Sequence, residues 1–90
     1  MSFKSQHIAV IGSGYVGTVV AACLAHVGHQ VVGVESDRAK LATLQQGGIP
    51  FHEAGLEDLV RSGIESGRLT FVGDIPVAME LCDIVFICVG

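Results

Sequence analysis

The sequence predicts an α/β fold, in which a doubly wound parallel sheet carries helices on both faces. Short apolar runs alternate along the chain with segments of helical periodicity, as in parallel strands joined by helical crossovers. Half of the 90 residues are hydrophobic and only 16% are charged, which suits strands covered on both faces. The first apolar run also passes directly into the glycine-rich segment Gly12–Gly17, which is typical of a strand-to-helix turn. A chain of this length forms at most one small domain.

The first strand and the first helix flank the glycine-rich segment. We expect the strand over residues 7–12 and the helix over residues 15–27. Three alanines of the helix permit close packing: Ala21, Ala22 and Ala25. Gly28 follows directly and supplies the left-handed residue with which many helices end.

The second strand runs from His29 or Gln30 to Glu35, through an apolar stretch. Asp37 is placed to cap a second helix, and we favour this role over that of a second ribose ligand. The helix carries Leu41 and Leu44 on one face and stops at Gly47 and Gly48.

A loop over residues 49–55 leads to a third helix, which is amphipathic. Its apolar residues follow the i, i+3, i+4, i+7, i+8 spacing of one helix face: Leu56, Leu59, Val60, Gly63 and Ile64. The helix ends at Gly67, and residues 69–72 form the third strand.

Asp74 is placed to cap a short helix that continues through Glu80, with Pro76 tolerated in its first turn. The fourth strand occupies residues 83–89. Because its side chains are apolar on both faces, it is expected to be an interior parallel strand.

Right-handed crossovers arrange the four strands in the order 3-2-1-4, which is one half of a Rossmann-type sheet. We therefore expect residues 1–90 to be the amino-terminal half of such a domain, either as a fragment or completed by another molecule. The outer edge of the fourth strand then lacks a partner, so we also expect self-association through residues 83–89.

Each glycine of the Gly12–Gly17 segment has a separate role in a dinucleotide-binding turn. Gly12 permits the sharp turn, Gly14 lets a pyrophosphate approach the backbone, and Gly17 lets the helix pack closely on the strands. The helix then offers its free N–H groups and its positive dipole end to the phosphates. Glu35 follows Gly17 by 18 residues, near the position expected for an acid that binds a ribose. The segment, Glu35 and Val89-Gly90 should converge at the carboxyl ends of the strands.

Several classes of function are disfavoured by composition. A net charge of −4 argues against nucleic acid or an anionic membrane as a partner. No apolar run approaches 18 residues, and the first residues lack the apolar core of a signal peptide, so we expect a cytoplasmic protein. The three cysteines lack metal-ligand spacing and are expected to be free, small buried hydrophobes: Cys23, Cys82 and Cys88. No metal site is expected.

Across nearly all of its length the chain resembles the amino-terminal region of the UDP-glucose/GDP-mannose dehydrogenase family. The resemblance is carried by IAVIGSGYVG at 8–17, VVGVESD at 31–37, Lys40, PFHEAGL at 50–56 and DIVFICVG at 83–90. The pair Tyr15-Val16 and the E-x-G-L string are more specific than the glycines. They separate the chain from other Rossmann enzymes such as hydroxyacyl-CoA dehydrogenases, which remain an alternative.

The resemblance implies an NAD-dependent, four-electron oxidation of the C6 hydroxyl of a nucleotide sugar to a carboxylate. In the family this chemistry passes through a thiohemiacetal on a cysteine that lies well beyond the segment seen here. The resemblance therefore assigns no catalytic residue to this chain, which is expected to be inactive alone. The nucleotide-sugar substrate would contact the missing region.

The resemblance also assigns cofactor contacts. It places Gly12, Gly14, Tyr15, Val16 and Gly17 on the pyrophosphate, Glu35 on the adenine ribose and Lys40 beside that ribose. The convergence of the strand ends adds Val89 and Gly90 to the residues expected to contact the cofactor.

Two departures from the family pattern matter. The acid that ends the second strand is often Asp, and here it is Glu35, whose carboxylate should still favour NAD over NADP. Ala54 replaces a proline, which loosens the loop before the third helix.

Lys40 could instead be a solvated helix residue, and Glu53 could contact the nucleotide region or only start the third helix. A non-catalytic nucleotide-binding or interaction module with the same half-fold is the alternative function.

Overall fold

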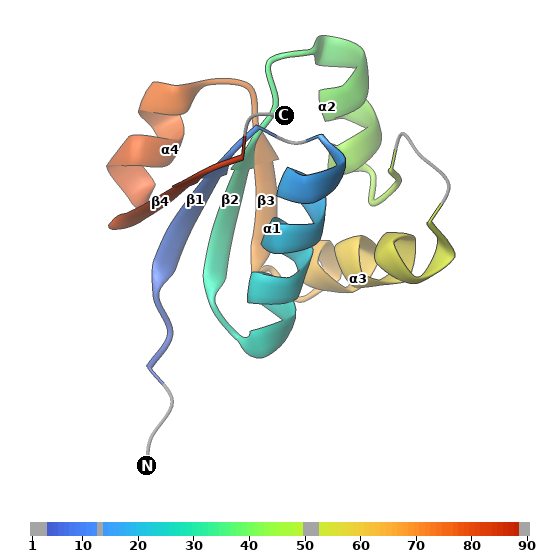
Figure 1. Ribbon diagram of the computed structural model, residues 1–90, viewed down its shortest axis with the longest axis horizontal. Helices are drawn as coiled ribbons and strands as arrows, with labels where there is room; N and C mark the ends of the chain where they lie inside the picture. The colour runs from blue at the N-terminus through green and yellow to red at the C-terminus, as the bar shows by residue number, and fades with distance from the viewer. Residues whose placement is uncertain (1–3, 13, 50–52, 89–90) are drawn as a thin grey trace.

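The computed structural model describes residues 4–12, 14–49 and 53–88, and it contains one four-stranded parallel sheet (Figure 1). The strands are β1 (His7–Ile11), β2 (Gln30–Val34), β3 (Leu69–Val72) and β4 (Ile84–Ile87). The helices are α1 (Tyr15–Val27), α2 (Arg38–Gln45), α3 (Ala54–Glu65) and α4 (Ile75–Leu81). The observed strand order β3-β2-β1-β4 confirms the prediction.

The strands pair in parallel with their carboxyl ends level. Ile11 of β1 lies opposite Val34 of β2 and Ile87 of β4, and Val34 lies opposite Val72 of β3. Parallel pairing continues one residue beyond three of the strands, because the backbone N–H groups of Gly12, Glu35 and Cys88 donate to Val34, Val72 and Ile11. The loops that follow the strands therefore start in one row.

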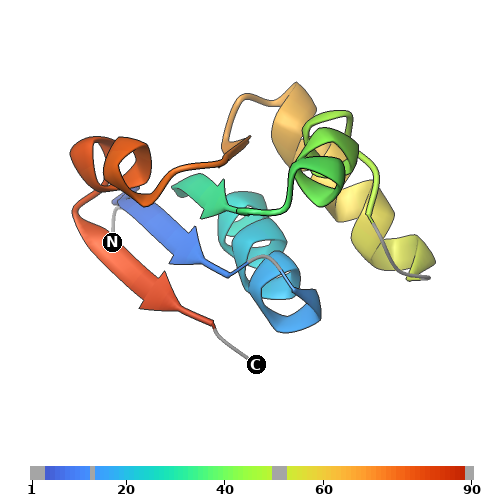
Figure 2. The same ribbon diagram turned by 90° about the horizontal axis from the view of Figure 1, so that it is seen from above.

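Two apolar cores cover the faces of the sheet. The larger one packs α1 and α3, with Leu44 of α2, on one face of the strands. The smaller one packs Ala78 of α4 against Ala9 and Val34 on the opposite face, and Figure 2 shows α1 and α4 on opposite sides of β1. The predicted close packing of α1 is confirmed, since its three alanines are almost fully buried: Ala21, Ala22 and Ala25.

The helix ends mostly match the predictions. Gly28 has a φ of 123°, and its N–H donates to the carbonyls of Ala25 and Leu24. Asp37 caps α2, accepting from the N–H groups of Ala39 and Lys40 at 2.9 and 3.0 Å. The expectation that Asp74 caps α4 is wrong in one respect, because its side chain accepts no hydrogen bond from the helix although it occupies the N-cap position.

The third helix begins at Ala54, so the loop predicted over 49–55 ends earlier than expected. Glu53 takes the N-cap position of α3, also without a side-chain cap hydrogen bond. The helix keeps its predicted apolar stripe, with Leu56 and Val60 in the main core and Leu59 packed against it.

β4 has the sequence of an interior strand but lies at the edge of the sheet described here. Its side chains are exposed on both faces: Ile84 to 38%, Phe86 to 43% and Ile87 to 69%. The strand ends at Ile87, whereas the prediction ran to Val89, which lies outside the described residues.

The expectation that the cysteines are buried is wrong for Cys23, which is exposed. It falls on the solvent side of α1, because the helical repeat directs Ala22 and Ala25 inward instead. Cys82 and Cys88 are partly buried, and all three thiols are free.

No helix in the part of the chain that the structure describes has both the length and the hydrophobicity needed to cross a bilayer. Nor do the described side chains include three or more His, Cys, Asp or Glu grouped to hold a metal ion.

Candidate functional site

The segments after β1, β2 and β3 meet at the carboxyl edge of the sheet. The N–H of Gly12 donates to the Val34 carbonyl at 3.3 Å, and the N–H of Glu35 donates to the Val72 carbonyl at 2.9 Å. These bonds fix the glycine turn beside the residue that precedes Glu35. The predicted phosphate turn and the predicted ribose acid are therefore brought together by the backbone.

The glycine turn that connects β1 to α1 is compact. Gly12 has a φ of 94°, in the left-handed region that favours glycine. A Cβ on Gly17 would overlap the carbonyl oxygen of Gly12, so the start of α1 rests directly on the turn. The expected packing role of Gly17 fits this geometry. The Cβ of Cys88, the last described residue, would also lie 3.5 Å from a Cβ on Gly17.

Gly14 differs from Gly17, because a Cβ on it would meet no described atom within 4 Å. It is the N-cap of α1, and no side chain caps the helix there. Tyr15 and Val16 begin the helix with exposed side chains, 51% and 63% respectively. The amino end of α1 and the open space beside Gly14 fit a pyrophosphate, with the predicted contacts of Gly14, Tyr15 and Val16 on its side.

Glu35 holds its carboxylate in a defined position at the end of β2. Its Oε2 accepts from the backbone N–H of Asp37 at 2.8 Å, and the residue is partly buried. A carboxylate ordered in this way retains acceptor capacity for ribose hydroxyls. The arrangement fits the role predicted for Glu35.

Lys40 lies in the first turn of α2, exposed to solvent. Its backbone N–H donates to Asp37, but its side chain forms no ion pair with Glu35 within the described residues, where Arg61 makes both salt bridges. The structure thus places Lys40 near the ribose acid in the chain without joining the two. Val89 and Gly90, also predicted to contact the cofactor, lie outside the described residues.

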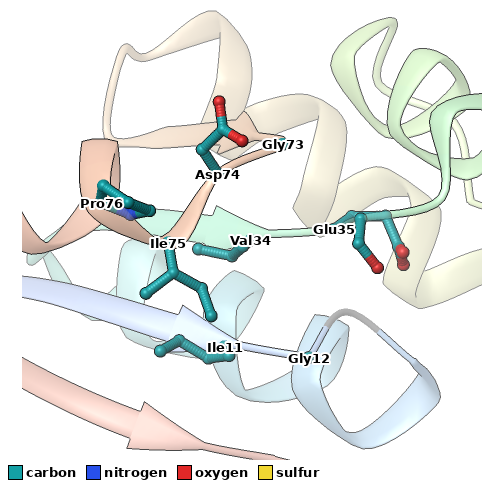
Figure 3. A pocket seen from close by; sticks show the side chains of 9 residues that line it. Ile11, Gly12, Val34, Glu35, Gly73, Asp74, Ile75 and Pro76 are labelled. Carbon is teal, nitrogen blue, oxygen red and sulfur yellow. The ribbon is translucent and has the colours of Figure 1, made fainter.

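A pocket of about 450 Å³ opens between the ends of β1, β2 and β3 and the start of α4. Figure 3 shows Val34 and Ile75 between Asp74 and Ile11, with Glu35 apart from them on one side. The remaining lining residues are Gly12, Ser36, Gly73 and Pro76. Its size and its apolar walls with few polar groups are typical of small-molecule sites.

Sequence reasoning assigned no site role to Asp74 or Ile75, although both line this pocket. The signal was present, because they follow the third strand of a sheet whose strands all end at one edge.

The Cys82 thiol lies in surroundings that disfavour its reactive form. Burial, and secondly the negative charge of Asp83, raise the pKa of the Cys82 thiol, so its reactive thiolate is disfavoured.

Comparison with known proteins finds one family over nearly the whole chain. Residues 6–90 match the model of the UDP-glucose/GDP-mannose dehydrogenase family, NAD binding domain. UDP-glucose 6-dehydrogenase of Rhizobium meliloti is 48% identical over 83 residues, 92% of this chain and 19% of that protein. GDP-mannose 6-dehydrogenase of Pseudomonas putida is 43% identical over 85 residues, 94% of this chain and 19% of that protein.

Solved structures agree with the sequence relatives. The fold resembles GDP-mannose dehydrogenase from Pseudomonas aeruginosa, solved as a ternary complex, with a TM-score of 0.91 and 42% identity. That match covers 94% of this chain and 20% of the other. A UDP-glucose dehydrogenase from Pyrobaculum islandicum gives a TM-score of 0.91 at 36% identity, covering 97% and 20%. The chain thus spans about a fifth of the length of these relatives.

Proposed function

The chain belongs to the UDP-glucose/GDP-mannose dehydrogenase family and carries its NAD-binding domain, and from this premise we propose that it holds NAD for the oxidation of a nucleotide sugar. The proposed reaction of the whole enzyme converts the C6 hydroxymethyl group of a UDP-glucose-type or GDP-mannose-type substrate into a carboxylate. Two hydrides are removed in successive rounds, water supplies the second carboxylate oxygen, and protons are released. Bound NAD would accept one hydride in each round.

The observation that carries this proposal is the position of the Gly12–Gly17 turn beside Glu35. The Gly12 to Val34 hydrogen bond joins the phosphate turn to the strand that presents the ribose acid. Gly14 offers open space to the pyrophosphate at the positive end of the α1 dipole. Glu35 offers a carboxylate, ordered by the Asp37 N–H, to the ribose hydroxyls. Lys40 approaches the same ribose when its long side chain turns toward Glu35.

The same carboxylate supports NAD over NADP. A 2′-phosphate would lie against Glu35, and like charges at that distance repel each other. No described lysine or arginine lines the pocket itself, but Lys40 beside the ribose would offset part of this repulsion, so we expect a moderate preference for NAD over NADP.

We propose that residues 1–90 supply one mononucleotide half of the domain, and that the catalytic and sugar-binding residues belong to the rest of the enzyme. The chain alone should therefore bind NAD weakly and leave nucleotide sugars unchanged. Full-length protein should produce two NADH per sugar oxidised when tested with a panel of UDP- and GDP-sugars. NADH production by the 90-residue chain with UDP-glucose would contradict the division of roles. Failure of the full-length protein with every nucleotide sugar would contradict the proposed reaction.

The exposed edge of β4 supports self-association of the chain. Within the described residues β4 pairs with β1 alone, and Ile84, Phe86 and Ile87 expose apolar surface along it. An unpaired apolar edge is a template for a second strand. Sedimentation should detect dimers or larger species whose fraction rises with concentration, and Phe86→Lys should lower that fraction. Strictly monomeric sedimentation at high concentration would contradict this proposal.

A further inference from the structure

The outer edge of β4 adjoins the end of α4, and both elements expose apolar side chains. We propose that two copies of the chain pair their β4 strands in the antiparallel direction, about a two-fold axis at Phe86. Leu81 of each copy then covers Ile87 of the other. The geometry rests on the self-association proposed above, and it names the surface and the side chains through which the copies meet.

The residues of β4 divide between two faces according to the cores on which they pack. Val85 packs with Ala78 of α4, and Cys88 packs on the opposite face against the core that contains α1. Side chains alternate along a strand, so Ile87 shares the face of Val85. Phe86 shares the face of Cys88 for the same reason. A two-fold axis perpendicular to the sheet places each face beside the same face of the second copy.

One antiparallel register respects these faces and opposes apolar residues throughout β4. Its facing pairs are Phe86 with Phe86, Val85 with Ile87, and Ile84 with Cys88. A shift of the axis to Val85 would instead set Asp83 against Ile87. A shift of the axis to Ile87 would set Ile84 against no residue that the structure describes. The axis at Phe86 also opposes two aromatic rings, a pairing that stabilises adjacent strands.

The charge of Asp83 favours the antiparallel direction over a parallel one. In a parallel pair related by a two-fold axis, the two Asp83 carboxylates would face each other across about 5 Å, where like charges repel. In the antiparallel register each Asp83 lies three residues from Phe86 on its own side of the axis. The two carboxylates are then roughly 20 Å apart, which exceeds the Debye length at physiological salt, so their repulsion is screened.

Leu81 and Val77 extend the surface from β4 onto α4. They lie one helical turn apart, and Leu81 is the last residue of α4, close in the chain to the start of β4 at Ile84. Because Val85 lies on the face that α4 covers, Ile87 of the second copy, opposite Val85, would enter the space beside Leu81. The contact would remove apolar surface of both side chains from water.

The area of this surface matches what a dimer needs. Leu81 and Val77 join three exposed side chains of β4, and on average the five are about half exposed. A large apolar side chain presents on the order of 200 Å² when fully exposed, so together they offer roughly 500 Å². A standard interface buries about 800 Å² per partner, about 60% of it apolar. The exposed side chains therefore suffice for an interface of ordinary size.

Sedimentation equilibrium of the 90-residue chain tests the surface with two matched variants. Leu81→Lys places a charge against Ile87 of the second copy and should raise the dimer dissociation constant at least about tenfold. Val27→Lys is the control, because Val27 exposes 59% of its surface against 58% for Leu81 but lies on α1, outside the proposed surface. Its dissociation constant should stay within about twofold of the original. Urea unfolding verifies that each variant retains the fold.

The geometry can also be tested without a substitution, by isotope-filtered Overhauser spectra of mixed labelled and unlabelled chains. Methyl contacts are expected between Val85 of one copy and Ile87 of the other. The two Ile84 side chains should show no contact, because they lie roughly 14 Å apart along the antiparallel strands. A contact between them would indicate parallel pairing and overturn the geometry.

The outcomes separate this geometry from the proposals on which it rests. Strictly monomeric sedimentation would overturn both the geometry and the self-association. Dimers whose dissociation constant is unchanged in Leu81→Lys would overturn the geometry alone. NAD titration of the same samples decides the proposed cofactor role independently, because neither Leu81 nor Val27 lines the pocket beside Glu35.

Discussion

Gly14 and Gly17 belong to one turn, but the absence of a side chain has a different consequence at each position. A Cβ at Gly17 would overlap the carbonyl oxygen of Gly12, whereas a Cβ at Gly14 would meet no described atom within 4 Å. Gly17→Ala should therefore damage the fold, and Gly14→Ala should damage only ligand binding. The pair thus separates packing from phosphate approach within a single loop.

The two stability changes can be worked out from these contacts. Relief of the Gly17→Ala overlap requires α1 to move away from β1, because the opposing atom belongs to the backbone. Overpacking of this kind costs up to about 3 kcal/mol, equivalent to a melting temperature lower by roughly 10–25 °C for a domain of this size. Gly14→Ala loses about 0.5–1 kcal/mol of N-cap preference and regains about 0.4–1 kcal/mol through a less flexible unfolded chain. Its free energy of unfolding should change by less than about 0.5 kcal/mol.

NAD affinity should fall because of a direct clash in Gly14→Ala, the variant whose stability changes less. A methyl group on Gly14 would occupy the space that a pyrophosphate needs, so the Kd for NAD should rise at least about tenfold, or 1.4 kcal/mol. Urea unfolding and calorimetric titration measure the two quantities. Gly55→Ala is the control, because Gly55 is equally open but lies at the start of α3. Unchanged NAD affinity in Gly14→Ala would refute the phosphate placement, and unchanged stability in Gly17→Ala would refute the packing argument.

Three further predictions concern residues around this turn and the α4–β4 connection. Glu35→Gln should weaken NAD binding about fivefold and narrow the preference over NADP, since it removes the charge that repels a 2′-phosphate; titration with both dinucleotides measures this. Asp37→Ala should cost about 1 kcal/mol of stability in urea unfolding through loss of the α2 cap, with little change in NAD affinity, because the backbone N–H that holds Glu35 remains. The raised pKa of Cys82 means that less thiolate is present at a given pH, so its alkylation by iodoacetamide at pH 8 should be slower than that of exposed Cys23 and should accelerate as pH rises. Asp83→Asn removes the second cause of the raised pKa and should speed that alkylation; an unchanged rate would contradict the assignment.

The sequence predicted the strand order because that order depends on a rule rather than on detailed packing. Alternating strands and helices with right-handed crossovers leave one arrangement for the four strands. Glycine spacing likewise predicted where Gly12 and Gly17 lie, since a strand-to-helix turn at a sheet edge has few solutions. The role of Glu35 as the ribose acid was predicted from its distance of 18 residues from Gly17.

Features that depend on contacts distant in sequence were not predicted. Nothing near Gly33 in the sequence indicates that the ring of Phe71 occupies the space where a side chain at this position would be. Cys23 is a different case, because its exposure follows from the local helical repeat that turns Ala22 and Ala25 inward. Asp74 was interpreted as a helix cap, because its local sequence carries that signal while its place in the pocket depends on β2 and β3. Such features require the sheet to be assembled first.

The register of the sheet explains how the glycine turn and Glu35, which lie apart in the sequence, form one candidate site. Gly12, Glu35 and Gly73 each stand one place beyond Ile11, Val34 and Val72, which lie level across the sheet. Neither the glycine turn nor the acid needs a side-chain contact to reach the other, because the backbone ladder continues through them. Adjacent strands are separated by about 4.8 Å, so the row spans roughly the width of a nucleoside from the turn to Gly73. The next residue along the chain is Asp74, so the lining of the pocket continues from the turn and the acid to the start of α4.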